Sequence, residues 1–211
     1  MSGAAVDAEY AALASDYDED WAAYNRATTE RTLRALRDRA PGDRGDEPGR
    51  ALDVGCGTGA LLARLTPAAA TAGVGLDRSA EMLAVARRRL SAASLVRGEA
   101  TALPFPDAAF AAAVTNSSLH YADDPAAGVR ELARVVRPGG TVVWTDWDGG
   151  ALTTRGVVAW LRLTRRPLGR VLSATAMAEA LRDAGLTDVR LDRWRHGWLW
   201  GLATVSGRKP G

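Results

Sequence analysis

Between residues 50 and 147, short apolar runs alternate with stretches in which apolar residues recur at helical spacing. Strands are predicted at 51–54, 73–77, 94–98, 109–116 and 141–147, and helices at 59–65, 79–90 and 125–136. Strands that alternate with helices are typical of a parallel sheet with helices on both faces. We therefore expect an α/β fold with a doubly wound sheet.

The C-terminal part of the chain departs from this alternation. Residues 175–185 have the pattern of a helix that ends at Gly185, and two strands follow at 188–194 and 198–207. Only residues 195–197 join these strands, a link too short for a crossover helix, so the two strands should be antiparallel. The predicted fold is a Rossmann-like sheet of seven strands, mostly parallel, with an antiparallel last strand.

Composition and charge narrow the functional classes. The 211 residues include 27 Lys and Arg against 25 Asp and Glu, a balance that gives no reason to expect a nucleic-acid partner. A single cysteine, Cys56, excludes an intrachain disulfide and a cysteine-based zinc site. No leader-like pattern and no apolar stretch of the ~20 residues that span a bilayer is visible. We expect a cytoplasmic protein without bound metal or stable membrane association.

The segment LDVGCGTGALL carries three glycines in five positions directly after a predicted strand. Gly55, Gly57 and Ala60 have the spacing of a dinucleotide fingerprint, and Asp77 stands where a ribose-binding carboxylate is expected. A loop whose backbone is free of side chains allows the close approach of any adenosine ligand, including NAD. The alternative is that these glycines only form a tight turn and bind no ligand. Asp53 disfavours a pyrophosphate, because its carboxylate suits an ammonium or sulfonium group.

Four segments together resemble the class I S-adenosylmethionine (SAM) dependent methyltransferases, in the small-molecule, type 11 branch that includes the ubiquinone and menaquinone biosynthesis enzymes. They run in the family's order: LDVGCGTGALL, GLDRSAEMLAVAR, GEATALPFPDAAFAAAVTNSSLHY and ELARVVRPGGTVVWTDW. The resemblance covers about residues 50–147, and the family's sheet also ends in an antiparallel seventh strand. It implies SAM as cofactor and S-adenosylhomocysteine as its product.

The resemblance also implies which residues hold the methionine and ribose parts of SAM. Gly55 and Gly57 would lie against both parts, and Asp53 would stand near the amino group. Asp77 would accept hydrogen bonds from the ribose hydroxyls, and Asn116 would contribute at the methionine end.

Other matching residues are implied around the adenine and above the cofactor. Met82 would pack near the adenine, and Glu99 with the Ala100 backbone would bind around its amine. Glu99 departs from the family, which usually has Asp there, and Ala111 also replaces a usual Asp. Tyr17 matches a helical lid over the cofactor.

Candidate catalytic residues follow the fourth predicted strand. His120 is the best candidate for a general base, because imidazole titrates near neutrality and ligands bind at the carboxyl ends of such strands. Tyr121, Asp146 and Asp148 lie at similar strand ends and would orient an acceptor. The alternatives are that His120 only forms hydrogen bonds within its own loop, and that Tyr121, Asp146 and Asp148 are ordinary polar loop residues without a role in the reaction.

Residues 151–172 are the least family-like segment and carry five arginines and no acidic residue: Arg155, Arg162, Arg165, Arg166 and Arg170. This pattern favours an anionic acceptor or the approach of a lipid-like one from a membrane surface, and a solvated helix face is the alternative. Near the N-terminus, Tyr17, Trp21 and Tyr24 would line the substrate cavity or form the buried stripe of a helix.

We expect one domain over 1–211, divided into an N-terminal helical lid (1–45), a SAM-binding core (50–147), a lid at the acceptor site (148–174) and a final helix with hairpin (175–207). The predicted activity is methyl transfer from SAM to O, N or C of a small molecule, anionic or a secondary metabolite (EC 2.1.1.-), by a monomer or homodimer. A SAM-binding cyclase or scaffold that does not methylate is the alternative, followed by an NAD(P)-dependent oxidoreductase.

Overall fold

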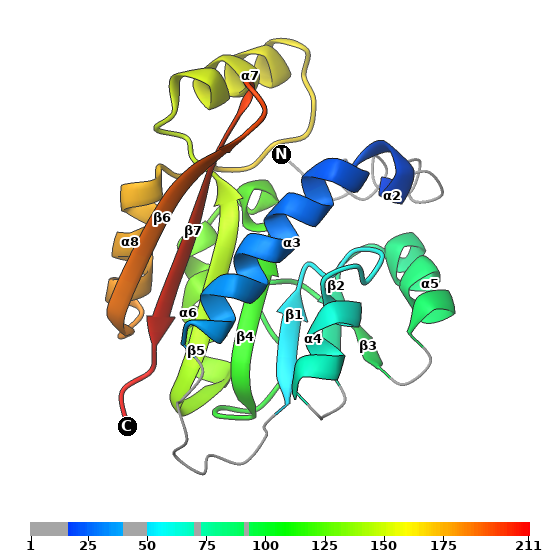
Figure 1. Ribbon diagram of the computed structural model, residues 1–211, viewed down its shortest axis with the longest axis vertical. Helices are drawn as coiled ribbons and strands as arrows, with labels where there is room; N and C mark the ends of the chain where they lie inside the picture. Colours follow the sequence, from blue (N-terminus) through cyan, green and yellow to red (C-terminus); the bar gives the residue numbers. More distant parts are fainter. Residues whose placement is uncertain (1–16, 40–49, 70–72, 91–92) are drawn as a thin grey trace.

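The computed structural model describes residues 17–39, 50–69, 73–90 and 93–211 (Figure 1). Its centre is a seven-stranded sheet in the order β3-β2-β1-β4-β5-β7-β6. The strands are β1 (Ala51–Val54), β2 (Val74–Asp77), β3 (Ser94–Arg97), β4 (Phe110–Asn116), β5 (Val136–Trp147), β6 (Thr187–His196) and β7 (Trp200–Arg208). Strands β1 to β5 pair in parallel, and β7 pairs antiparallel with both β5 and β6. The predicted seven-stranded α/β fold with its antiparallel strand is confirmed.

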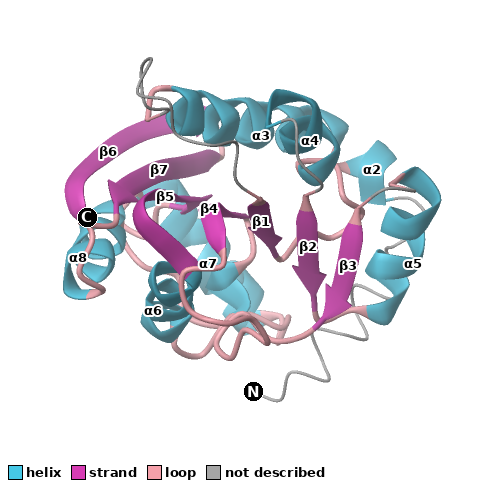
Figure 2. Cartoon of the chain, turned by 90° about the horizontal axis from the view of Figure 1, so that it is seen from below, coloured by secondary structure: helices cyan, strands magenta, loops and turns pink. Residues whose placement is uncertain are grey.

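Helices cover both faces of this sheet, as predicted. They are α2 (Tyr17–Asp20), α3 (Ala22–Arg37), α4 (Leu62–Ala69), α5 (Ala80–Arg89), α6 (Pro125–Val135), α7 (Leu152–Leu163) and α8 (Ala174–Asp183), with a 3₁₀ turn at Leu119–Tyr121. Figure 2 shows α3 and α4 on one face and α6 and α8 on the other. Of the predicted N-terminal segment, residues 1–16 and 40–45 lie outside the described residues.

Local sequence accounts for where several helices begin. Ser79, Asp124 and Ser173 each accept a hydrogen bond from the backbone N–H three positions further on, at the starts of α5, α6 and α8. Pro125 follows Asp124 at the first helical position, where a missing N–H costs nothing. Such side-chain caps contribute about 1 kcal/mol each, so these starts are set by single residues.

Several predicted boundaries differ from the structure, and two of these differences have a clear cause. Strand β5 begins at Val136 instead of 141, because Val136 already pairs with Phe110 of β4, and residues 137–140 form an irregularity before the pairing resumes at Thr141 and Ala112. Helix α4 begins at Leu62 instead of 59, because the three glycines before it all have positive φ and hold the chain in a loop. The turn of the last hairpin lies at 197–199, not 195–197.

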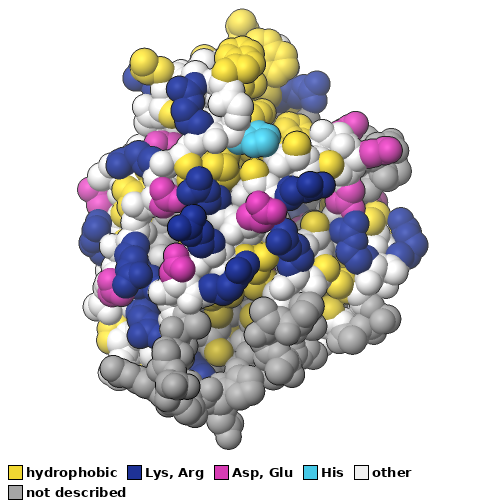
Figure 3. All heavy atoms as spheres, in the orientation of Figure 1, with side chains coloured by type: hydrophobic (Ala, Val, Ile, Leu, Met, Phe, Trp, Pro, Cys, Tyr) yellow, Lys and Arg dark blue, Asp and Glu magenta, His cyan; other side chains and the backbone are white. Residues whose placement is uncertain are grey.

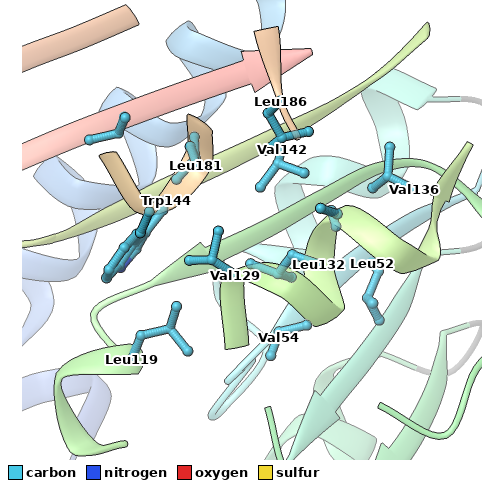
Figure 4. Close-up of a cluster of buried hydrophobic side chains, with 14 of the residues drawn as sticks. Leu52, Val54, Leu119, Val129, Leu132, Val136, Val142, Trp144, Leu181 and Leu186 are labelled. Atoms are coloured by element: carbon cyan, nitrogen blue, oxygen red, sulfur yellow. The ribbon is translucent and has the colours of Figure 1, made fainter. Parts of the chain in front are cut away.

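The main hydrophobic core lies between the sheet and the helices α6 and α8 (Figure 4). Leu52, Val54 and Val142 of the sheet and Leu132 and Leu181 of the helices are all fully buried in it. This packing holds β1, β4 and β5 rigidly side by side. The loops at the carboxyl ends of these strands therefore start from fixed positions.

The opposite face is covered by α3 through an unusually polar contact. Thr32 Oγ1 donates to Thr145 Oγ1 at 2.7 Å, and Thr145 hydrogen-bonds Thr204 at 3.1 Å, which ties α3 to β5 and β7. Tyr24 of the same helix reaches a smaller cluster with Trp147 and Leu202. None of the helices in the described part of the chain has the length and apolar character needed to cross a bilayer.

Candidate functional site

A cavity of about 480 Å³ opens where β1, β2 and β4 end. The loops that follow these strands, the start of α5 and residues 117–124 form its walls. Eight of the nine residues predicted to bind the cofactor line it: Tyr17, Gly55, Gly57, Asp77, Met82, Glu99, Ala100 and Asn116. Residues far apart in the sequence are thus brought to one cavity at the carboxyl edge of the sheet.

The glycine loop forms the floor of this cavity. Gly55 has φ +73°, and a Cβ there would lie 2.3 Å from the Cβ of Ser118, so only glycine fits. Gly57 has φ +52°, and a Cβ there would meet no protein atom within 4 Å. The surface of the cavity at Gly57 is therefore bare backbone, open to close approach by a ligand.

Asp77 is held by this loop at the end of β2. Its carboxylate accepts hydrogen bonds from the backbone N–H of Gly57 at 2.8 Å and of Ser79 at 2.9 Å. Burial raises its pKa, and these two amides and that of Arg78 act against the rise by stabilising the charge. A carboxylate fixed at a cavity wall in this way is suited to accept from paired hydroxyls such as those of a ribose.

Asp53 is the one predicted cofactor residue that does not line the cavity. It lies in β1 with 1% of its surface exposed, beneath the glycine loop. Burial and the nearby charge of Asp77 raise the pKa of Asp53 to about 8. Its Oδ2 atom has no hydrogen-bond partner among the described residues. A direct contact between Asp53 and the amino group of SAM stays a prediction.

The remaining predicted residues occupy the far walls. Asn116 donates from Nδ2 to Thr28 Oγ1 at 3.0 Å, while its buried Oδ1 has no partner in the described part of the chain. Met82 is buried against the cavity, and Glu99 stands at the rim, where it pairs with Arg78 at 3.5 Å. The unpaired amide oxygen of Asn116 is an acceptor available to a ligand amino group.

A second cavity of about 560 Å³ adjoins the first. Tyr17, Ser117 and Tyr121 line both cavities, so they mark the junction. Most of the second cavity is aromatic and apolar: Trp21, Tyr24, Trp147, Trp160 and Trp200 line it with Val157, Leu161, Pro167 and Leu199. Its walls come from α2, α3, α7 and the β6–β7 turn.

His120 faces this second cavity and belongs to a buried hydrogen-bonded pair. Its Nδ1 atom lies 2.5 Å from Oδ1 of Asp146, and its ring stacks on Trp147 with centroids 4.3 Å apart. The ring is also 4.1 Å from that of Tyr121. The Nε2 atom has no hydrogen-bond partner among the described residues. With Nδ1 bonded to Asp146, Nε2 is the ring nitrogen that remains for another group, and it is itself buried.

Asp146 and Asp148 contact groups of the protein itself, whereas the sequence analysis expected them to orient an acceptor. Asp146 is 1% exposed and bonded to His120, so it cannot orient an acceptor directly. Asp148 accepts from the backbone N–H of Gly150 and Ala174, which joins the ends of the 148–174 segment. Both side chains therefore hold protein groups in place.

The arginines of residues 151–172 are mostly outside the cavities. Of the five, Arg166 alone lines the second cavity, and all five are exposed to solvent. Figure 3 shows hydrophobic side chains gathered at the end of the molecule formed by α7 and the β6–β7 turn, beside Lys and Arg. Trp160 and Trp198 there are 56% and 79% exposed. Most of these arginines therefore lie on a solvent-exposed helix face, which is the alternative given in the sequence analysis.

Some lining residues escape sequence reasoning. Ser117 has φ +52° and lies at the junction, where its Oγ is 2.8 Å from the hydroxyl of Tyr24. Trp147 of β5 is a second such residue, and it meets Trp200 of β7, whose sequence position suggests an aromatic wall or packing in the sheet, with ring centroids 4.9 Å apart. Their contact depends on the register of the antiparallel strands. No local motif reports that register; only the clustering of Trp near strand ends points to it.

Comparisons with known proteins bear on this site. Residues 52–144 match the model of a family described as a methyltransferase domain. A malonyl-[acyl-carrier protein] O-methyltransferase of Pseudescherichia vulneris is 30% identical over 203 residues, which cover 96% of this chain and 72% of the relative. A demethylmenaquinone methyltransferase of Clavibacter sepedonicus is 32% identical over 173 residues, covering 77% and 69% of the two chains.

Solved structures agree with these sequence matches. A SAM-dependent methyltransferase from Thermotoga maritima superposes with a TM-score of 0.74 at 20% identity, covering 95% of this chain and 97% of that one. This likeness shows a shared fold. Across eight curated relatives, the aligned stretch covers between 30% and 72% of the relative's own length, so several are considerably longer than the part they share.

Proposed function

Because the chain belongs to the class I SAM-dependent methyltransferases, as its motifs predict, we propose that it transfers a methyl group from SAM to a small molecule in the cavity beside His120. The observation that carries this proposal is the junction of the two cavities. Tyr17, Ser117 and Tyr121 line both, so a ligand in one directly adjoins a ligand in the other. Transfer between two bound molecules requires such contact.

The residues of the first cavity fit SAM, the cofactor of this family. The bare backbone at Gly57 admits close approach, and the carboxylate of Asp77 suits the ribose hydroxyls. The unpartnered Oδ1 of Asn116 suits the methionine amino group. Met82, Glu99 and Ala100 would surround the adenine. When bound, SAM supplies an electrophilic methyl group, whose bond to sulfur breaks with the electron pair passing to sulfur.

His120 is proposed as the general base for the acceptor. Nε2 would take the proton that the acceptor hydroxyl loses as its oxygen forms the bond to the methyl carbon. Asp146 would hold the opposite ring nitrogen as the donor, which keeps Nε2 free to accept. A positioned base of this kind contributes roughly 10²- to 10⁴-fold. One relative is named an O-methyltransferase, which supports oxygen as the methylated atom.

Tyr121 and the two predicted lids would enclose the acceptor. Tyr121 lies at the junction against the ring of His120, where its phenol would orient the acceptor edge. Tyr17 and Trp21 of the predicted N-terminal lid and Trp160 of the 148–174 segment line the same cavity. Closing them over the ligands would exclude water, which would otherwise compete for the methyl group.

Calorimetric titration with S-adenosylhomocysteine tests the cofactor half of this proposal, with NADH as the paired control. Micromolar affinity for the first and none for the second is the expected result; the reverse would contradict it. Incubation with SAM and candidate acceptors, followed by mass spectrometry, tests transfer. A gain of one CH₂ group (about 14 Da) supports methylation. A converted product of unchanged mass would instead favour the cyclase alternative.

A further inference from the structure

Aromatic rings form a continuous wall along the second cavity. Each ring contacts the next at a centroid distance of 4.1 to 6.0 Å, from one end of the wall to the other. In order along the wall, the rings are those of Tyr24, Trp21, Trp200, Trp147, His120 and Tyr121. The wall ends beside the junction with the cofactor cavity.

Two polar groups of this wall, the Tyr24 hydroxyl and the Trp147 indole N–H, are hydrogen-bonded within the protein. The indole N–H of Trp147 donates to the hydroxyl of Tyr24 at 3.0 Å, and that hydroxyl also bonds Ser117 Oγ at 2.8 Å. These bonds hold the rings in fixed orientations. The wall therefore offers ring surface to a ligand, and Nε2 of His120 is its one buried polar atom without a partner in the described chain.

Helix α7 and the segment after it complete the lining. Gly156, Val157, Trp160 and Leu161 of the helix line the cavity together with Pro167. The cavity is therefore lined by aromatic rings and by the apolar side chains of α7. A flat ring system stacks on aromatic side chains over a larger contact area than a puckered one of the same size.

The charges that line the cavity determine whether a cationic, neutral or anionic flat ligand can bind. Aromatic walls also attract cations, so an ammonium compound is the obvious rival. Among the described residues that line this cavity, however, there is no Asp or Glu, and Arg166 is the one permanent charge. No acidic side chain of the described lining would pair with an ammonium group there, and the positive charge of Arg166 would repel it. The cavity thus disfavours amines despite its aromatic lining.

We propose that the second cavity binds a flat, fused-ring aromatic acceptor, neutral or singly negative, with a hydroxyl at its edge directed to Nε2 of His120. The role of the hydroxyl rests on the proposed methyl transfer, whereas the binding of the aromatic acceptor does not. A volume of about 560 Å³ accommodates several fused rings and lies within the usual range for ligand sites. The acceptor class is thereby narrowed from any small molecule to an aromatic alcohol.

Three matched probes test this inference by calorimetry on the full chain, with and without saturating S-adenosylhomocysteine. They are 2-naphthol, its puckered counterpart decahydro-2-naphthol, and 2-naphthylmethylamine, which is protonated at neutral pH. We expect 2-naphthol to bind at least tenfold more tightly than either of the others. Equal or tighter binding of the amine would mean a cation site. Equal binding of the decahydro compound, or no binding of 2-naphthol, would equally overturn the proposal.

Two tryptophan variants locate the binding. Trp200→Leu removes a central ring of the wall, whereas Trp198→Leu changes a 79% exposed residue of the same hairpin. We expect the first to weaken 2-naphthol binding about tenfold or more and the second to leave it unchanged. Equal effects would place the probe elsewhere and contradict the inference.

Each variant is also titrated with S-adenosylhomocysteine and melted, so that a folding defect is recognised. Should Trp200→Leu fail to fold, Trp160→Leu on the exposed helix tests the same cavity. If the unmodified chain did not bind S-adenosylhomocysteine, that result alone would contradict the proposed function. If it bound S-adenosylhomocysteine but not 2-naphthol, only the inferred acceptor class would be contradicted.

Discussion

Nδ1 of His120 lies 2.5 Å from Oδ1 of Asp146, and both side chains are buried beside the aromatic cavity. The carboxylate accepts three further hydrogen bonds, from the indole N–H of Trp144 and from the backbone N–H of His120 and Trp147. Four donors leave Asp146 no freedom to rotate. The imidazole is therefore fixed in one orientation, with Nδ1 directed at the carboxylate.

Asp146→Asn should lower kcat by roughly 10²- to 10⁴-fold, because the new amide can donate to Nδ1 and force the proton onto Nε2, which could then no longer act as a base. The affinity for S-adenosylhomocysteine should stay within about threefold, since Asp146 does not line the cofactor cavity. The measurement is the pH dependence of kcat, whose profile should change in the variant because Nε2 can no longer act as a base.

Asp148→Asn is the matched control, a buried acid two positions on that bonds backbone N–H groups and not His120. Its turnover per folded molecule should keep the pH profile of the unmodified enzyme. If Asp146→Asn kept full turnover with an unchanged profile, His120 would be structural, or the acceptor would need no base.

Gly57→Ala should weaken S-adenosylhomocysteine binding by tenfold or more while the protein stays folded. The new Cβ meets no protein atom, so it occupies the space that the ligand needs. The positive φ of this residue adds about 1–2 kcal/mol of strain. Gly139→Ala is the control, because Gly139 also has positive φ and open space around it but lies outside the cavity.

Both glycine variants should lose similar stability in a thermal melt, and only Gly57→Ala should lose ligand affinity in calorimetry. Equal affinities in the two variants would show that the ligand does not approach the Gly57 backbone. That result would remove the main reason for placing SAM in this cavity.

Asp77→Ala should reduce S-adenosylhomocysteine affinity by about 100-fold or more. A hydrogen bond to a charged group contributes about 1.5–3 kcal/mol, and the carboxylate would accept two from the ribose. Glu99→Ala should cost less than tenfold, because Glu99 stands at the rim with an exposed side chain paired to Arg78. Calorimetric titration of both variants measures the difference. A larger loss for Glu99→Ala would reverse the assignment of the two carboxylates.

Sequence patterns predicted those parts of the site whose residues are close together in the sequence. The glycine loop, Asp77 at the end of its strand and the Ser79 cap depend on neighbours in the sequence, and the structure has all three where the pattern placed them. The pair of His120 and Asp146 spans two strand ends, and the order of strands in the sheet decides that they meet.

The aromatic wall was harder to predict for the same reason. Trp147 and Trp200 meet because β5 and β7 pair antiparallel, with Trp147 opposite Leu202. A change of register by one residue would turn either ring to the other face. Asp53 has the motif position of a ligand contact, but both faces of β1 are buried, so a direct contact with the cofactor stays a prediction.

Asp53 should make stability depend on pH. Its pKa in the folded protein is raised to about 8 by burial, from 3.8 for a free carboxyl. Between these values the folded protein keeps a proton that the unfolded chain has released, so the free energy of unfolding falls as pH rises. Asp53→Asn is neutral and similar in shape, and it should remove this part of the decrease.

Thermal melts from about pH 5 to pH 8 measure the effect as the difference between Asp53→Asn and the unmodified chain. The difference should grow with pH in favour of the variant, and by pH 8 should exceed about 1.4 kcal/mol, the equivalent of one pKa unit. Asp183→Asn controls for charge alone, because Asp183 is an exposed residue at the end of α8. A constant difference would mean that Asp53 is already ionised when buried, which would require a partner for its carboxylate beneath the glycine loop.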